Sequence, residues 1–156
     1  MKKLLLILAL LTGMNLFAAE IHWVPSYKEA LALSKKEKKP IIFVMKKHGC
    51  QFCEKLERET FSNPIVINEI NKNFVPYKVM ADEPSACVPY MLAVYTNGFP
   101  TIWFLNSDGK VLMGVDPQTK KDYIFKIPGF VDAKVMIEIL KDAQKSYEKN
   151  ITFGGH

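Results

Sequence analysis

Two cysteines separated by two residues, Cys50 and Cys53, are the feature that most constrains how this chain can fold. An apolar run at 41–45 precedes them, and a helix-forming stretch at 54–59 follows. At the start of a helix, such a pair can form and break a disulfide without unfolding the chain. Backbone N–H groups and the helix dipole favour a thiolate on Cys50 there. Zinc ribbons use the same spacing, but the flanking strand and helix favour a redox pair.

The first nineteen residues predict where the chain works. Two lysines precede an apolar run at 4–11, and the segment ends in two alanines. This order is typical of a secretory signal peptide. An uncleaved anchor is the alternative, although a membrane-spanning helix needs about 20 apolar residues. We therefore expect residues 1–19 to be removed and residues 20–156 to reach the periplasm, an oxidising compartment.

The charge of the chain argues against a nucleic-acid partner. The formal net charge is +5 at pH 7, and the signal segment carries two of the positive charges. A lysine run at 35–39 is expected to form the solvated end of a helix. A nucleic-acid face would need wider basic coverage with aromatic platforms. The mature segment is long enough for one domain with its own core.

Helix and strand signals alternate in the first half of the mature chain. Ser26 to Glu29 forms a capping-box pattern that begins a helix. The run at 41–45 predicts a buried parallel strand, and 74–79 predicts a second strand. Between them, the helix that starts at the cysteines is expected to end near Phe61. Asn63 then begins another helix, with proline at its first position.

The second half predicts an antiparallel hairpin and a final helix. Apolar stretches at 101–105 and 111–115 flank an Asn-Ser-Asp-Gly turn, which indicates a hairpin. Asp132 is expected to cap the last helix. Its apolar face is predicted to comprise Val135, Met136, Ile139, Leu140 and Ala143. The combination predicts an α/β fold with a mixed central β-sheet flanked by helices.

Together with the cysteine pair, the segment Gly98-Phe99-Pro100-Thr101 makes the mature chain resemble the thioredoxin superfamily. The resemblance implies a thioredoxin-like domain over 20–156, with a cis Pro100 that lies against the cysteines and offers an extended edge to substrate. Two further segments resemble periplasmic thioredoxin-like domains of thiol:disulfide interchange reductases. They are Thr60-Phe61-Ser62 and Ile127-Pro128-Gly129-Phe130.

Four positions depart from the pattern of that superfamily. Thioredoxins usually have Trp before the first cysteine and Gly-Pro between the pair, whereas this chain has Gly49 and Gln51-Phe52. Many also have a buried Asp six residues before the first cysteine, where this chain has Val44. The usual buried proton acceptor is therefore missing.

The expected chemistry uses the sulfur atoms of the two cysteines and needs no cofactor. Cys50 would attack a substrate disulfide, and Cys53, one turn further in, would resolve the mixed disulfide. Glu57 follows Cys53 by four residues, so it could exchange a proton with Cys53; the alternative is a solvated helix carboxylate near lysines. Lys47 and His48 could favour the Cys50 thiolate, or could be exposed loop residues.

Cys87 leaves an odd number of cysteines in a chain expected to be exported. An unpaired cysteine in such a chain suggests intermolecular pairing or a regulatory thiol. The alternative is a small buried side chain. Three large aromatic residues, Trp103, Phe104 and Phe125, are assigned to the core.

A thiol:disulfide oxidoreductase is the leading functional hypothesis. The alternatives are a copper or zinc carrier using His48, Cys50 and Cys53, and a redox-inactive binding module. Periplasmic oxidases of this superfamily carry an inserted helical domain, but only 20 residues separate Val79 from Pro100. We therefore expect a reductase of disulfide-bearing proteins, kept reduced by a membrane thiol donor, rather than an oxidase or isomerase.

Overall fold

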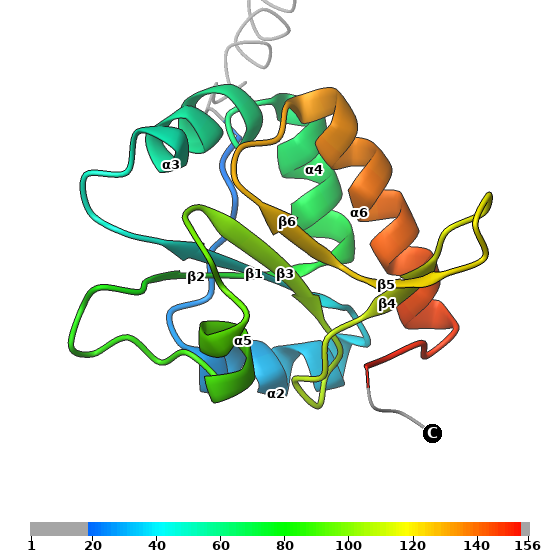
Figure 1. Ribbon diagram of the computed structural model, residues 1–156. Coiled ribbons are helices and arrows are strands. Elements are labelled where there is room, and N and C mark those ends of the chain that lie inside the picture. The colour runs from blue at the N-terminus through cyan, green and yellow to red at the C-terminus, as the bar shows by residue number, and fades with distance from the viewer. Residues whose placement is uncertain (1–18, 154–156) are drawn as a thin grey trace, which may run out of the picture.

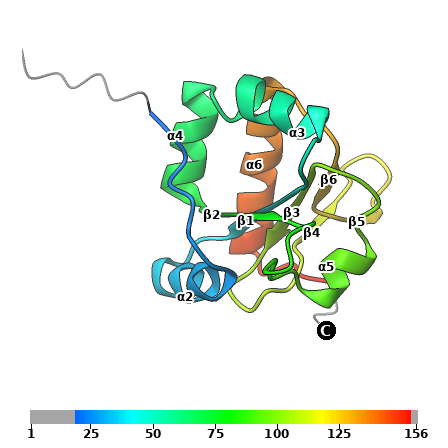
Figure 2. The same ribbon diagram turned by 90° about the vertical axis from the view of Figure 1, so that its left-hand side faces the viewer.

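The computed structural model describes residues 19–153, so the expected signal peptide lies almost wholly outside the described residues. A four-stranded sheet forms the centre, with α2 and α5 on one face and α3, α4 and α6 on the other (Figures 1 and 2). The strands of this sheet are β1 (Ile41–Lys46), β2 (Val75–Met80), β3 (Thr101–Leu105) and β6 (Lys126–Pro128). The helices are α2 (Tyr27–Glu37), α3 (Gln51–Lys55), α4 (Pro64–Asn73), α5 (Tyr90–Val94) and α6 (Ala133–Glu148).

Strand β1 lies at the centre of a mixed sheet with the order β2-β1-β3-β6. It pairs with β2 in parallel and with β3 antiparallel, so Val44 lies between Lys78 and Ile102. Helices cover both faces, and the first five residues of β1 are buried. The mixed, helix-flanked sheet expected from the sequence is confirmed.

Side chains along β1 alternate between two apolar layers. Ile42 and Val44 belong to the layer under α4 and α6, together with Phe104 and Phe125. Phe43 belongs to the opposite layer. The core assignment of Phe104 and Phe125 is confirmed, as is that of Trp103 in the second layer.

The helices begin where capping residues were expected. Ser26 Oγ accepts a hydrogen bond from the Glu29 N–H at 3.2 Å. Asn63 Oδ1 accepts one from the Ile65 N–H at 3.0 Å. Each such cap contributes about 1 kcal/mol to helix stability.

The last helix, α6, is capped by Asp132, but one of its expected core residues is exposed. Met136, Leu140 and Ala143 are buried, whereas Val135 is 41% exposed. Val135 is one position before Met136, and this step of about 100° around the helix turns it away from the sheet. The prediction that Val135 belongs to the apolar face of α6 was wrong.

The expected hairpin forms its turn but not its second strand. Asn106 N–H bonds to Lys110 C=O at 2.8 Å, and Gly109 adopts a φ of +77° that favours glycine. Val111 forms an antiparallel bridge with Leu105, and the Leu112 N–H bonds to Phe104 C=O at 2.8 Å, before the chain leaves β3. Strand β4 (Met113–Val115) pairs instead with β5 (Asp122–Ile124), and β6 takes the place beside β3. The predicted pairing of 111–115 with 101–105 is therefore confirmed only beside the turn, at Val111 and Leu112, and was wrong for 113–115.

Within residues 19–153, no helix has the length and apolar character needed to cross a membrane.

Candidate active site

The cysteine pair lies where β1 gives way to α3. Cys50 is the N-cap of α3, and Gly49 before it has a φ of +67°. Cys50 and Cys53 form a disulfide, with their Cα atoms 5.2 Å apart. The Cys53 N–H donates to Cys50 Sγ at 3.1 Å. This N–H belongs to the first turn of the helix and also bonds to the Cys50 C=O at 3.0 Å. Because it points at Cys50 Sγ, it would also stabilise a thiolate there.

The two sulfur-bearing residues differ in their access to solvent. Cys53 is 3% exposed, whereas Cys50 is half-buried. Phe52, between them, is 61% exposed. A partner can therefore reach Cys50 but not Cys53, which fits attack by Cys50 and resolution by Cys53.

The loop before Cys50 is held by the carboxylate of Asp82, which was not predicted as a site residue from the sequence. The His48 N–H donates to Asp82 Oδ2 at 3.1 Å, and His48 Nδ1 lies 3.2 Å from the same oxygen. His48 Nε2 lies 3.6 Å from Glu83 Oε1. Partial desolvation raises the pKa of Asp82, but the hydrogen bonds from the backbone and ring of His48 hold it below its usual value. His48 thus connects the loop before Cys50 to the loop after β2.

Glu57 lies in a π-helical segment, Leu56–Thr60, that continues α3. The Phe61 N–H bonds to Leu56 C=O at 2.9 Å, which is the i→i+5 pattern of such a segment. Glu57 Oε1 lies 2.6 Å from Lys46 Nζ and 3.5 Å from Lys78 Nζ. Glu57 is therefore a partly exposed helix carboxylate paired with two lysines, and its exchange of a proton with Cys53 stays a prediction.

We call the hollow around the disulfide the redox cleft; it is open and has a volume of about 500 Å³. It is lined by Lys46, Lys47, His48, Gly49, Cys50, Cys53, Glu54, Glu57, Arg58 and Met80. The structure thus brings Glu57, Lys47 and His48 together with both cysteines. Lys46 was not predicted as a site residue, although the alternation of Ile42 and Val44 along β1 indicated which face it would occupy.

Pro100 lies immediately before β3, next to the pair that Thr101 forms with Met45, the residue before the last of β1. The Phe99–Pro100 peptide bond is cis, and Pro100 C=O accepts a hydrogen bond from the Gly129 N–H at 2.7 Å. Pro100 is buried and does not line the redox cleft. Its role toward substrate stays a prediction.

Cys87 is an exposed free thiol in the segment between β2 and α5. The alternative of a small buried side chain was therefore wrong. The segment lacks the apolar cover that would bury Cys87, because the neighbouring residues 82–85 are themselves exposed.

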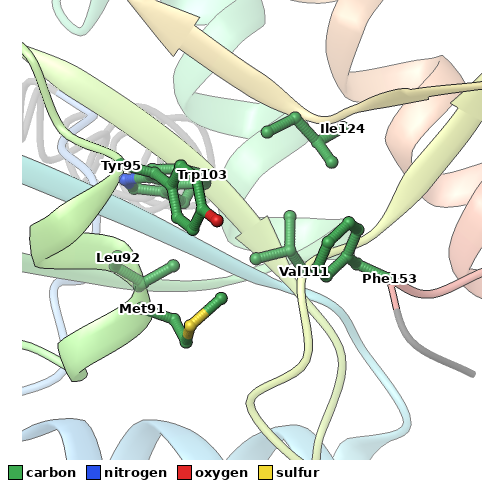
Figure 3. A pocket seen from close by; sticks show the side chains of 7 residues that line it. All are labelled: Met91, Leu92, Tyr95, Trp103, Val111, Ile124 and Phe153. Atoms are coloured by element: carbon green, nitrogen blue, oxygen red, sulfur yellow. The ribbon is translucent and has the colours of Figure 1, made fainter.

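A second hollow, which is small and apolar, lies apart from the disulfide. Its seven side chains gather around α5 and β3 (Figure 3). They are Met91, Leu92, Tyr95, Trp103, Val111, Ile124 and Phe153. Its volume is about 110 Å³, and it shares no lining residue with the redox cleft. Among residues 19–153, no three His, Cys, Asp or Glu side chains are grouped so that they could hold a metal ion.

Comparison with known families decides the classification. Residues 27–144 match the family model of the thioredoxin-like domain. The chain belongs to this thioredoxin-like family. The expected thioredoxin-like fold is confirmed, and its Cys50–Cys53 pair has the Cys-x-x-Cys arrangement of thiol:disulfide oxidoreductases.

Similar proteins agree on the fold of this thioredoxin-like chain. Spermatogenesis-associated protein 20 of Rattus norvegicus is 32% identical over 87 residues, which cover 55% of this chain and 11% of that protein. The chain therefore matches only a small part of this curated relative. A putative disulphide-isomerase of Bacteroides thetaiotaomicron has a TM-score of 0.59 at 23% identity, covering 84% of this chain and 96% of its own. The DsbH oxidoreductase has a TM-score of 0.57 at 21% identity, covering 86% and 92%.

Proposed function

We propose that this chain is an exported thiol:disulfide oxidoreductase that reduces disulfides of periplasmic proteins through Cys50 and Cys53. The observation that carries the proposal is the redox pair itself. A half-exposed Cys50 caps α3, and a buried Cys53 lies one turn further in, within bonding distance. The thioredoxin-like fold around the pair supports the same chemistry.

The proposed reaction moves two electrons from the protein to its substrate. The Cys50 thiolate attacks one sulfur of the substrate disulfide, and the other substrate sulfur leaves as a thiolate that takes up a proton. Cys53 then loses its proton and attacks Cys50 Sγ. This step forms the Cys50–Cys53 disulfide and releases the second substrate sulfur, so the substrate becomes a dithiol.

The reductase direction is supported by the short connection between β2 and β3. Of its 20 residues, five form α5 and the rest are irregular, so it holds no inserted helical domain. In an oxidising compartment thiols stay reduced only if a donor reduces them again. We therefore include a membrane thiol donor as a partner in the proposal.

The redox state of the pair in growing cells tests this proposal. Acid quenching followed by alkylation with a mass-tagged maleimide counts free thiols, and Cys87→Ser removes the third cysteine from the count. We expect Cys50 and Cys53 as a dithiol when the membrane electron supply is intact, and as a disulfide when it is removed. The reduction potential should lie nearer to about −270 mV than to about −120 mV.

Two outcomes would contradict the proposal. A pair found mostly as a disulfide whether or not the donor is present would favour an oxidase or isomerase. A purified, reduced protein that fails to reduce insulin would argue for a redox-inactive binding module. Recovery of the chain in the periplasmic fraction, shortened at its N-terminus, tests its export separately.

A further inference from the structure

Lys46 occupies a distinctive position on β1. Side chains along a strand alternate between faces, and Ile42 and Val44 belong to the apolar layer that also contains Leu56 of the π-helical segment. Lys46 is the next residue on that face and the last residue of the strand. The face of β1 therefore changes from apolar to positively charged where the strand meets the redox cleft.

The charge of Lys46 is shielded from water and directed at a carboxylate. Its side chain is 16% exposed, and its Nζ lies 2.6 Å from Glu57 Oε1. Lys78 of β2 approaches the same oxygen at 3.5 Å, and its ammonium also lies 4.6 Å from the centre of the Trp23 ring. Two ammonium groups thus share one carboxylate, so the cluster of Lys46, Lys78 and Glu57 carries a net positive charge, and its members Lys46 and Glu57 line the redox cleft with both cysteines.

Other charged groups around the redox cleft are more exposed than Lys46. They are Lys47, His48, Glu54, Glu57 and Arg58 in its lining, Lys78 on Glu57, and Asp82 and Glu83 on His48. Water and salt screen an exposed charge strongly and a partly buried charge much less. Lys46 should therefore act on the cysteines more strongly than its exposed neighbour Lys47.

We propose that Lys46 is a positioning residue, which holds the Glu57 carboxylate and supplies the positive charge that favours the Cys50 thiolate. The proposal rests on the proposed function, because it concerns the reduced pair. Because residue 44 is Val and not Asp, this face of β1 has no carboxylate, and the charge that it carries is the positive charge of Lys46. When the disulfide is reduced, the Cys50 thiol gives its proton to water, and its sulfur stays as a thiolate in the cleft that Lys46 also lines.

The pH dependence of Cys50 alkylation tests this proposal. The protein carries Cys87→Ser and is reduced, and the rate of its reaction with iodoacetamide is measured against pH, with the modified peptide identified by mass spectrometry. In Lys46→Met we expect the half-maximal rate to move up by about one pH unit, which is about a tenfold slower reaction near neutral pH. Lys46→Arg should restore the profile, because it keeps the charge.

Three further variants complete the test. Glu57→Gln removes the negative charge but can still accept a hydrogen bond from Lys46, so it should move the profile to lower pH. Lys72→Met removes one charge from the exposed side of α4, outside the redox cleft, and should leave the profile unchanged. Lys47→Met should shift it less than Lys46→Met does.

Several results would overturn the role of Lys46. If the ion pair is purely structural, its loss in Lys46→Met will lower the melting temperature but leave the alkylation profile unchanged. An equal shift in Lys47→Met would assign the effect to the loop instead. If Lys46→Met does not fold, an unchanged or upward shift in Glu57→Gln still refutes the proposal. None of these results depends on insulin reduction, so they are distinct from a failure of the proposed function.

Discussion

Thr60 ties the segment that carries Glu57 to the chain before α6. Its side chain is fully buried, and its Oγ1 donates to the Val131 C=O at 2.5 Å, across 71 residues of sequence. Thr60→Val keeps the shape of the side chain but removes this donor from a buried carbonyl. Leaving a buried acceptor unsatisfied costs about 1–3 kcal/mol. For a domain of this size, each kcal/mol lowers the melting temperature by roughly 3 °C, so we expect a loss of about 3–9 °C.

Thermal unfolding of the reduced protein, followed by circular dichroism, measures this loss. Thr60→Ser is the matched control, because it keeps the hydroxyl and loses one methyl group, which should cost only about 1 kcal/mol. The expected order of stability is wild type, then Thr60→Ser, then Thr60→Val. If Thr60→Val is as stable as the wild type, or more stable than Thr60→Ser, the methyl contact and not the hydrogen bond anchors this segment.

Three further predictions concern the redox pair and two titrating groups. Cys53→Ser should accumulate mixed disulfides through Cys50 on non-reducing gels, whereas Cys50→Ser should form none; equal amounts would reverse the roles. The lowered pKa of Asp82 stabilises the fold above the usual carboxyl pKa, and this contribution is lost as pH falls through the folded value. Melting temperatures of wild type and Asp82→Asn should therefore differ at neutral pH and converge in acid, and a constant difference would exclude a role for the charge. Burial, followed by the nearby charge of Cys87, raises the pKa of Tyr27, so its contribution is complete below about pH 10 and is lost above it. Tyr27→Phe should therefore lose less stability than wild type at alkaline pH, and parallel loss in both proteins would contradict this.

Features that depend on neighbouring residues could be predicted from the sequence. The caps at Ser26, Asn63 and Asp132 bond to N–H groups two or three residues away, so local spacing is sufficient to locate them. The same holds for Cys50 and Cys53, whose separation of three residues places the second cysteine one turn into α3.

Features that depend on distant residues could not be predicted in this way. Strand β6 pairs with β3 because the intervening chain folds back on itself as β4 and β5, and no local signal distinguishes this from the simpler hairpin. The bridge from Lys46 through Glu57 to Lys78 combines three elements, so it requires the register of β1 against β2. The π-helical segment that positions Glu57 likewise had no recognised sequence signal.

The edges of the central sheet also bear on self-association. An uncovered edge strand can pair with a strand of another molecule and start aggregation. The outer side of β2 is occupied by Val24, whose N–H bonds to Pro76 C=O at 2.8 Å. At the opposite edge, β6 has only three residues, begins with Lys126 and ends with Pro128, which has no N–H to donate. The bridge at Val24 and the short, proline-ended β6 therefore both limit how a neighbouring molecule could extend the central sheet.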